Sequence, residues 1–378
     1  MSDARETQRR HDGRDSAEPG MHSLAEILSQ PACWETCLTE LTGSQTVEEV
    51  TARFNRTGEW LFIGCGSSYY VALAAAATMK SLTGRPARAL PASEILLYPE
   101  LAFSGRSCAP VLISRSGQTS EVLKAAEVLQ ERNIPSVAVC CAKRQALEKL
   151  ATVTIILPAD EHSTVMTRSF TSMLLALQFL AGRIAGNEAY CDALIAMPEL
   201  AAAMLKPVPE WIREFVTRHN TFADYVCLGH GPFYGLACEY ALKVTEMSVS
   251  CAQFFHSLEF RHGPKSVVTP HTLLTFLLSE QGYQAECDLL EEVKALGGTT
   301  LVIAHQSNSR VHAAADLLVE LPLQLPELAR LAPFLVPGQL LGLYSGLKKG
   351  LNPDSPRHLS RAVILDDNGS QRPDHAAF

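Results

Sequence analysis

Two short segments of the chain combine glycine with small hydroxyl residues, a composition that suits phosphate binding. One contains Ser67 and Ser68 in the run CGSS, and the other contains Ser114, Ser116 and Thr119 in SRSGQTS. Each follows a predicted strand and precedes a predicted helix, so backbone N–H groups and the positive helix end should face one pocket. Helix caps and tight turns would explain either loop alone. Two such loops at neighbouring strand ends favour a phosphate cradle.

Charged residues in the second half could carry proton transfer. Glu239, Lys243 and Glu246 lie four and three positions apart in CEYALKVTEMS, which places them on one face of a predicted helix. A glutamate held beside a lysine can serve as a general base. A surface ladder of salt bridges is the alternative interpretation of this spacing.

The segment SLEFRHGPKSVV follows directly and places four more charged or titratable residues around a Gly-Pro turn: Glu259, Arg261, His262 and Lys265. Histidine can move protons near neutral pH, which makes His262 a second candidate for catalysis. A structural histidine is the alternative.

A third polar segment, Glu161–Arg168, lies between a predicted strand and a long predicted helix. We expect it to close over the ligand, with Thr167 and Arg168 reaching the ligand. Capping of the helix that begins near Thr167 is the alternative.

The elements that must position these residues alternate between strands and helices from Trp60 onward. Apolar runs predict strands at Trp60–Ile63, Pro110–Ser114, Ser136–Cys140 and Val153–Leu157. One predicted helix starts near Tyr69, and another follows Thr119, with apolar residues at helical spacing. Strands that alternate with helices of this length predict a parallel, doubly wound sheet.

An internal repeat extends this prediction to the second half. A shift of about 165 positions lays Gly64-Cys65-Gly66 onto Gly229-His230-Gly231, and it also places Ser114 on Ser279 and Gly117 on Gly282. The strand at 137–139 falls on 302–304 in the same register. We therefore expect a duplication in which both halves share one fold.

The two halves differ in one loop. The first copy has Arg115 between its two serines, whereas the second copy has Glu280 at that position. A carboxylate there would repel a phosphate, so we expect one phosphate site per chain, in the first half.

Composition limits the class of protein. The 378 residues suffice for two domains, and 47% apolar with 19% charged residues is ordinary for a globular chain. A net charge of −8 argues against nucleic acid as the main partner. The first 22 residues resemble a disordered leader and not a secretion signal, and no run predicts a membrane span. Eleven cysteines without paired CxxC units indicate reduced thiols, so we expect a cytoplasmic protein without a metal or cofactor.

The motifs SRSGQTSE, ALKVTE, FRHGPKS and PRHLSRAVIL carry a family resemblance. Together they resemble the isomerase half of glucosamine-6-phosphate synthase and its relatives, including galactosamine-type amino-sugar-phosphate deaminase/isomerases. The likeness is collinear over about residues 25–368. It implies two duplicated sugar-isomerase (SIS) domains, each a parallel sheet flanked by helices in a flavodoxin-like three-layer α/β/α arrangement. We expect no glutaminase domain before them.

The resemblance also implies roles for individual residues. The phosphate cradle would comprise Arg115 and the hydroxyl residues of the two loops. These hydroxyl residues are Ser67, Ser68, Ser114, Ser116 and Thr119. Glu246 would move a proton between the first two sugar carbons, with Lys243 beside it. His262 resembles a ring-opening histidine that the partner subunit supplies, which implies a homodimer with shared active sites. Arg357 matches a tail arginine that helps close the site.

One position departs from the family pattern. The synthase has a tail lysine that can form an imine with a ketose, where this chain has Arg361. A guanidinium stays protonated and cannot be that nucleophile, and neither Lys348 nor Lys349 matches the motif position. The expected function is aldose–ketose isomerisation of a hexose or amino-sugar 6-phosphate, with or without release of ammonia. The alternative is a regulatory sugar-phosphate-binding protein without turnover.

These inferences divide the chain into four parts. Residues 1–22 form the leader, 23–200 the first SIS domain with its cradle, 201–350 the second SIS domain, and 351–378 a tail that closes the site. The expected ligand is a sugar phosphate.

Overall fold

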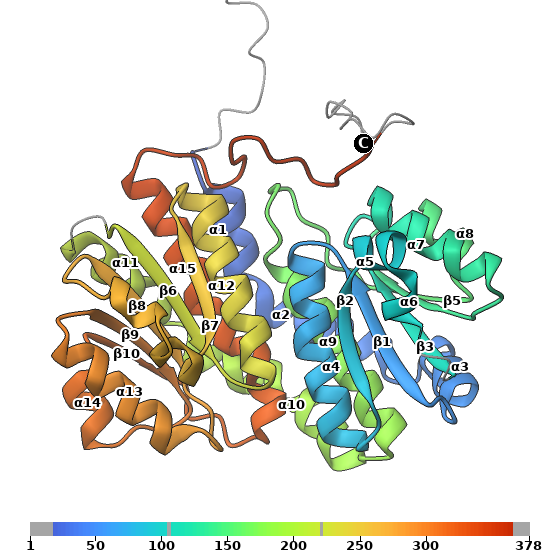
Figure 1. Cartoon of the computed structure of the whole chain (residues 1–378), viewed down its shortest axis with the longest axis horizontal. Coiled ribbons are helices and arrows are strands. Elements are labelled where there is room, and N and C mark those ends of the chain that lie inside the picture. Colours follow the sequence, from blue (N-terminus) through green and yellow to red (C-terminus); the bar gives the residue numbers. More distant parts are fainter. Residues whose placement is uncertain (1–17, 104–106, 220–221, 366–378) are drawn as a thin grey trace, which may run out of the picture.

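Two five-stranded parallel sheets organise the part of the chain that the computed structural model describes, residues 18–103, 107–219 and 222–365 (Figure 1). In spatial order the first sheet contains β2 (Ala87–Pro91), β1 (Glu59–Gly64), β3 (Cys108–Ile113), β4 (Val137–Cys140) and β5 (Val153–Ile156). The second contains, in the same sense, β7 (Ala252–His256), β6 (Asp224–Gly229), β8 (Thr272–Leu277), β9 (Thr299–Ala304) and β10 (Leu317–Glu320). Each sheet has the flavodoxin-like strand order 2-1-3-4-5, which confirms the predicted fold class.

Helices precede, connect and follow these strands. Those of the first half are α1 (Met21–Leu28), α2 (Gln30–Leu41), α3 (Gln45–Phe54), α4 (Ser67–Thr83), α5 (Ala92–Leu97), α6 (Pro99–Ala102), α7 (Ser120–Glu131), α8 (Ala146–Leu150), α9 (Arg168–Ala185) and α10 (Glu188–Leu205). Those of the second half are α11 (Val208–Arg218), α12 (Pro232–Ser248), α13 (Tyr283–Ala295), α14 (Ser309–Ala314) and α15 (Leu331–Lys348), with short 3₁₀ turns η2 (Ser257–Arg261), η3 (Pro264–Val267) and η4 (Glu327–Arg330).

The predicted repeat is visible in the element bounds. A shift of 165 positions carries β1 onto β6, α4 onto α12, β2 onto β7 and α6 onto η3 without a change of length. The later elements follow within a few positions of the same shift. The duplication is therefore structural, and residues of β1, α4, β2 and α6 have counterparts in the second half at a shift of 165.

Alternation along β1 explains the three layers. Trp60 and Phe62 join the large core that includes α4 and α9, whereas Leu61 and Ile63 join a smaller core with α5 and α7. Because successive side chains of a strand point to opposite faces, an apolar run without interruption requires helices on both sides. The second sheet repeats this division, since Val226 and Leu228 pack toward α13 and Tyr225 toward the large core.

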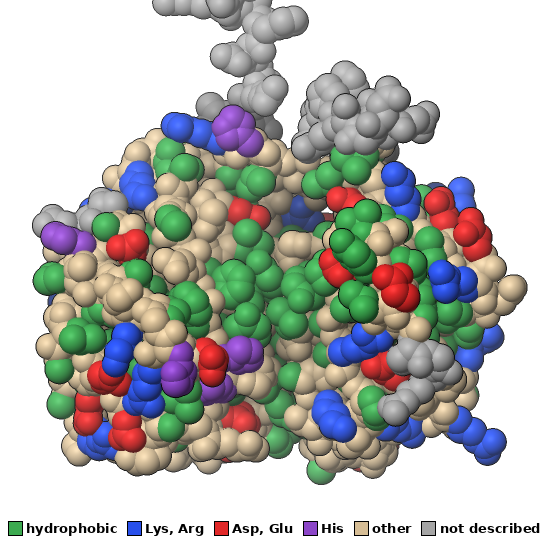
Figure 2. Space-filling model, in the orientation of Figure 1, with side chains coloured by type: hydrophobic (Ala, Val, Ile, Leu, Met, Phe, Trp, Pro, Cys, Tyr) green, Lys and Arg blue, Asp and Glu red, His purple; other side chains and the backbone are tan. Residues whose placement is uncertain are grey.

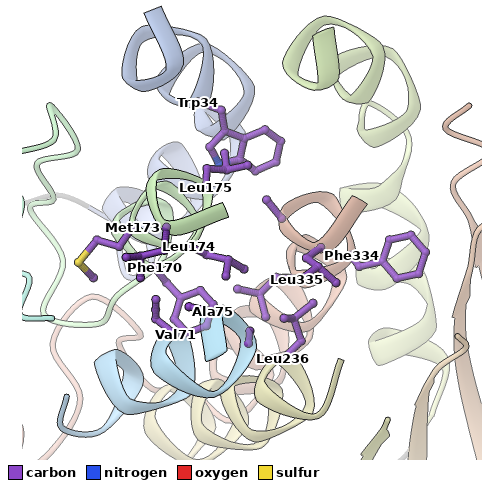
Figure 3. Close-up of a cluster of buried hydrophobic side chains, with 14 of the residues drawn as sticks. Trp34, Val71, Ala75, Phe170, Met173, Leu174, Leu175, Leu236, Phe334 and Leu335 are labelled. Atoms are coloured by element: carbon purple, nitrogen blue, oxygen red, sulfur yellow. The ribbon is translucent and has the colours of Figure 1, made fainter. Parts of the chain in front are cut away.

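One continuous core joins the two halves. In Figure 3, Val71 and Ala75 of α4 lie beside Leu236 of α12, Leu335 of α15 and Phe170 of α9. The two central helices approach closely, because a Cβ added at Gly235 of α12 would stand 2.8 Å from the backbone nitrogen of Ala74. The seam between α4 and α12 is therefore a packed interior.

The predicted leader and domain boundary fall near, but not at, element ends. Residues 1–17 of the leader lie outside the described residues, and α1 begins at Met21, before the predicted boundary. Asp354 explains this start, because its carboxylate accepts the first N–H groups of the helix from His22 and Ser23. The boundary predicted at residue 200 lies inside α10. None of the described helices is long and apolar enough to span a membrane, and the eleven cysteines form no disulfide in the described chain.

The contact between α15 and α12 generates a stability prediction. A Cβ at Gly338 would stand 2.2 Å from Cδ1 of Tyr240, whose buried hydroxyl donates to the carbonyl oxygen of Phe334 at 2.5 Å. We expect Gly338→Ala to lower the free energy of unfolding by about 1–3 kcal/mol, the usual cost of overpacking. Helix propensity alone would raise it by about 1 kcal/mol. Urea denaturation measures whether Gly338→Ala lowers or raises the free energy of unfolding. A gain in stability would contradict the tight packing between α15 and α12.

Candidate active site

The charged face of α12 is buried in the seam between the two halves. The Lys243 side chain is 0% exposed, and its Nζ lies 2.5 Å from Oε2 of Glu246 and 3.2 Å from Oε1 of Glu239. The Glu239 side chain is also fully buried, whereas that of Glu246 is 17% exposed. The spacing therefore forms a buried triad and not the surface ladder, and Glu246 is the member that solvent can reach.

Burial and charge shape the triad's protonation. Burial raises the pKa of Glu239 to about 8, although the Lys243 ammonium opposes this shift. Burial alone would lower the pKa of Lys243, but the two carboxylates outweigh it and raise that pKa above its usual value. Glu239 therefore holds a proton readily near neutral pH, while Lys243 stays charged.

Ser67, at the first position of α4, connects the triad to the first half. Its hydroxyl donates to Oε1 of Glu239 at 3.1 Å and accepts from Nζ of Lys243 at 3.4 Å. This member of the predicted cradle thus contacts the predicted base cluster across the seam. Ser68 is buried next to it at the start of α4.

The second cradle loop is ordered by its own hydroxyl groups. Oγ of Ser114 lies 3.0 Å from Oγ1 of Thr119 and accepts the N–H of Gly117, which adopts a left-handed φ of 64°. Oγ of Ser116 accepts the N–H of Gln118. These bonds are those of a tight turn, and they place three hydroxyl groups before the N-terminus of α7.

Arg115 in the same loop faces protein groups. Its buried guanidinium donates to the Glu161 carboxylate at 2.9 Å and to the carbonyl oxygens of Thr164, Val165 and Arg361. Burial raises the pKa of Glu161, but the Arg115 charge and hydrogen bonds from α9 outweigh burial and lower it. The structure therefore places Arg115 as the link between the cradle loop, the segment at 161–165 and the tail.

Thr167 and Arg168 also bond within the protein. The N–H and hydroxyl of Thr167 both donate to Oε1 of Glu161, and the Arg168 guanidinium contacts the carbonyl oxygen of Asp160 and the hydroxyl of Ser29. Glu161 caps the start of α9, because its carboxylate also accepts the N–H of Ser169 at 2.9 Å. This geometry corresponds to the capping alternative, with the glutamate and not the threonine as the cap.

The tail crosses from α15 of the second half to the first half, above the carboxyl ends of the first sheet (Figure 1). The carbonyl oxygen of Val363 accepts the N–H of Ser120 at 3.1 Å, and the N–H of Leu365 donates to Oγ of Ser120 at 2.9 Å. Arg357 is exposed, whereas the Arg361 guanidinium donates to the carbonyl oxygen of Glu161. Residues 366–378 of the predicted tail lie outside the described residues.

Lys348 and Lys349, the alternatives to a tail lysine, bond to the second half. Nζ of Lys348 donates to the carbonyl oxygen of Val216 at 2.7 Å, and Nζ of Lys349 donates to Oγ of Ser250 at 2.6 Å. Neither ammonium group contacts the triad.

His262 lies at the end of η2, on the second half, and is exposed. The neighbouring Arg261 and Lys265 form ion pairs with Glu292 of α13, at 2.9 Å for Arg261. These ion pairs hold the segment on α13. Within one chain the structure therefore does not bring His262 to the triad.

The second copy of the cradle is filled by carboxylates. Oε2 of the buried Glu286 accepts both the N–H and the hydroxyl of Ser279, and Oε1 of Glu327 accepts the N–H of Glu280 at 2.5 Å. The Glu280 carboxylate itself pairs with Arg330. The sequence predicted that the Glu280 carboxylate would repel a phosphate from this loop. In the structure the carboxylates that accept from the donors of Ser279 and Glu280 are those of Glu286 and Glu327.

The sequence analysis assigned no individual role to three buried carboxylates that join distant segments near the site. Glu26 accepts from Ser163, Asp354 accepts from the start of α1, and Glu161 binds Arg115. Glu161 stood in a segment already singled out, but Glu26 and Asp354 have partners more than 130 positions away. No local pattern could have indicated those two.

The metal and cofactor question has a limited answer. Among the described residues, no group of three or more His, Cys, Asp or Glu side chains is arranged to hold a metal ion. The chemistry that the geometry offers is proton transfer by a carboxylate beside a loop pair suited to an anion.

Known proteins resemble the chain in sequence and in fold. It is 27% identical to the glutamine–fructose-6-phosphate aminotransferase [isomerizing] of Pseudomonas putida over 96% of this chain and 62% of that protein, and 27% identical to the Pyrococcus horikoshii protein of the same name over 91% and 57%. The chain thus spans about six-tenths of the length of these relatives.

Solved structures agree in fold. Glucosamine-6-phosphate deaminase of Thermotoga maritima is 29% identical, with a TM-score of 0.70 over 91% of this chain and 100% of that one. Tagatose-6-phosphate ketose/aldose isomerase of Escherichia coli is 23% identical, with a TM-score of 0.80 over 95% and 100%. The SIS domain model matches residues 55–183 and 225–332, one match on each sheet. The chain therefore belongs to the SIS-domain family and contains two SIS domains.

Proposed function

We propose that the protein isomerises a hexose or amino-sugar 6-phosphate between aldose and ketose forms. The observation that carries this proposal is the triad of α12 reaching Ser67 at the start of α4, which sets a base beside a phosphate-type loop. The sequence relatives and the solved structures of similar fold, which are named for sugar-phosphate reactions, support the substrate class.

The phosphate would bind where α4 and α7 begin. The proposed donors are the helix N-termini and the hydroxyl groups of Ser68, Ser114, Ser116 and Thr119, since the Ser67 hydroxyl is engaged with the triad. The guanidinium groups of Arg115 and Arg168 are engaged by protein groups, so we assign them to positioning the loops. Arg357, exposed on the tail, is the cation left to approach the ligand.

Glu246 is the proposed base. Its carboxylate takes the proton from carbon 2 of the open-chain aldose; the C–H electron pair becomes the C1–C2 double bond, and the carbonyl π pair moves onto the carbon 1 oxygen, which takes a proton from solvent to give an enediol. The protonated Glu246 then returns its proton to carbon 1 as the C1–C2 π pair forms the new C–H bond, while the 2-hydroxyl gives its proton to solvent and its O–H pair becomes the C2=O bond of the ketose. Lys243 is buried and cannot reach the sugar, so it acts by holding Glu246 in place and by stabilising negative charge beside it.

Release of ammonia is the second candidate reaction for the same site. With a 2-amino sugar, the same proton transfer gives an enamine that becomes an imine at carbon 2, and water then replaces ammonia there. The 29% identity to a glucosamine-6-phosphate deaminase favours this possibility. Arg361 excludes imine formation by the side chain at its own position.

His262 is proposed to open the sugar ring in the partner subunit's site. This assignment rests on the family resemblance, on its exposure at the end of η2 and on the ion pairs that hold its segment on α13. A two-fold dimer would then hold two equivalent shared sites.

A substrate panel tests the proposal as a whole. Hexose and 2-amino-hexose 6-phosphates are incubated with the protein and followed by NMR for ketose and ammonia. Turnover of one member supports the enzyme. Saturable binding without any turnover across the panel would instead support the regulatory sugar-phosphate-binding alternative.

The cradle is tested by Ser116→Asp, which places a carboxylate before the N-terminus of α7. We expect the dissociation constant of the best sugar phosphate to rise at least tenfold, because two anions would compete for the same donors. Calorimetry measures the change. The control is Ser309→Asp, which puts the same carboxylate at the start of α14, outside the site. Equal affinity in both variants would remove this loop from the binding site.

The base is tested by Glu246→Gln, which keeps the shape of the side chain and loses its basic oxygen. We expect turnover to fall by about 10²–10⁴-fold, the usual contribution of general-base catalysis, with little change in binding. Exchange of solvent deuterium into carbon 2, followed by NMR, measures the step directly. The control is Glu40→Gln on the exposed surface of α2. Unchanged exchange in Glu246→Gln would assign the proton transfer to another residue.

The shared site is tested by subunit mixing. Glu246→Gln chains and His262→Ala chains are each expected to be inactive as pure dimers. After exchange, half of the chains would lie in heterodimers that hold one site with both lesions and one with neither, so activity should approach roughly a quarter of the wild-type rate per chain. Subunit exchange is verified by mass. A mixture that stays inactive after proven exchange would place base and histidine in the same chain.

A further inference from the structure

A second cleft lies between the two halves and is the repeat image of the candidate active site. It has a volume of about 620 Å³ and is lined by Lys80 and Ser81 of α4 and by the loop around Ser279. The 165-residue shift carries Lys80 onto Thr245 and Ser81 onto Glu246, just as it carries Ser114 onto Ser279. The second cleft thus occupies, in the repeat, the position that the triad and the cradle loops occupy in the candidate active site.

The second cleft has lost the groups that suit a phosphate. Pro232 and Phe233 replace Ser67 and Ser68, which removes two hydroxyl groups and one backbone N–H. The N–H and hydroxyl of Ser279 donate to Glu286, and the N–H of Glu280 donates to Glu327. Its apolar lining consists of Ala76, Ala77, Ala87, Pro232, Phe233 and Leu328, and polar or charged side chains such as Lys80, His230 and Glu327 also border it.

An exposed apolar ridge lies on the first half. Leu97, Tyr98 and Leu101, on and between α5 and α6, have exposed fractions of 69%, 52% and 59%. Exposed apolar residues that gather in this way mark interaction sites more often than scattered ones do. Figure 2 shows hydrophobic side chains along the middle of the face on which α4 and α12 lie, and Figure 1 places α5 and α6 on the same side of the molecule.

The ridge is the repeat image of the His262 segment. The same shift carries Leu97 onto His262, and it also pairs Glu94 with Glu259 and Pro99 with Pro264. The buried anchors correspond as well, since Ile95 and Phe260 are both 0% exposed. One copy of the segment therefore ends in a polar group that suits a reaction site, and the other ends in apolar groups.

Internal symmetry relates the candidate active site to the second cleft, and the His262 segment to the apolar ridge. Because the elements of the two halves match and α4 packs against its own repeat image α12, with Gly235 against Tyr70 and Ala74, we infer an approximate two-fold axis at this seam. If this axis crosses the dimer axis at right angles, every contact between subunits occurs twice, once in each repeat. A dimer that inserts His262 into the partner's active site would then insert the ridge into the partner's second cleft. The apolar lining of that cleft is the surface such a ridge would require.

We propose that Leu97, Tyr98 and Leu101 of one chain pack into the second cleft of a second copy of this chain, where they act as an apolar dimer contact in place of a ligand. This inference rests on the shared-site dimer proposed above. The segment that became catalytic in one repeat serves assembly in the other.

Photocrosslinking tests the contact directly. Leu97→benzoylphenylalanine keeps a large apolar group at the ridge, and unlabelled and ¹⁵N-labelled chains are mixed so that mass spectrometry separates crosslinks between chains from those within one. We expect crosslinks between chains that map to residues 76–81 or 230–233. Crosslinks between chains at other positions, crosslinks confined to one chain, or none in a sample shown to be dimeric would overturn the proposal.

A matched pair of charge substitutions measures the contribution of the ridge. We expect Leu97→Glu to raise the dimer dissociation constant at least tenfold in analytical ultracentrifugation, because it places a charge in an apolar contact. The control is Leu200→Glu on the exposed face of α10, which should leave dimerisation unchanged. Circular dichroism verifies that both variants are folded. Equal dimerisation of the two variants would refute the ridge contact.

The outcomes separate this inference from the shared active site. Recovery of activity in the subunit mixture, together with crosslinks at other positions, would leave the trans histidine intact and remove only the ridge contact. A protein that stays monomeric at all concentrations would remove both.

Discussion

The buried ammonium group of Lys243 is the constraint on which the rest of the site depends. Removing an ion from water costs several kcal/mol unless partners compensate for the loss. Lys243 meets this requirement with Glu239 and Glu246 on its own helix and with Ser67 across the seam. Because Ser67 begins α4, satisfying one charge in the second domain fixes the start of a helix in the first. The α12 triad and the loop at the start of α4 are thereby held in a single arrangement.

The duplicated fold shows that this charge is a feature of one half only. The counterparts of Glu239, Lys243 and Glu246 on α4 are Ala74, Thr78 and Ser81, and the Thr78 hydroxyl simply bonds back to the carbonyl oxygen of Ala74. One helix of the seam thus carries three ionisable groups and the other carries none at these positions. Where the ionisable groups of α12 meet α4, Ser67 accepts from Lys243 and donates to Glu239.

The fold was more accessible to sequence reasoning than the site. Continuous apolar runs such as Trp60–Ile63 and a repeat that holds register over several loops depend on local pattern, and both predicted the sheets. The hydrogen bond between Ser67 and Glu239 joins residues 172 positions apart. The sequence placed Ser67 in the phosphate cradle and Glu239 on a charged helix face, but it could not indicate that the two side chains meet. Arg115 illustrates the opposite limit: an arginine in a glycine-rich loop suggests an anion, yet the nearest anion is Glu161 of the same chain.

That ion pair bears on how the site could close. The Arg115 guanidinium binds Glu161, two carbonyl oxygens of the adjacent segment and the carbonyl oxygen of Arg361 in the tail. Arg361 in turn donates to the carbonyl oxygen of Glu161, so both arginines bond to the segment at 161–165, and Arg115 also bonds to the tail. Guanidinium groups suit this task because their donors are fixed in a plane and stay charged. A lysine at 361 would offer a nucleophile but a less directional contact, and the arginine there fits the proposed mechanism, in which the tail serves closure and proton transfer is assigned to Glu246.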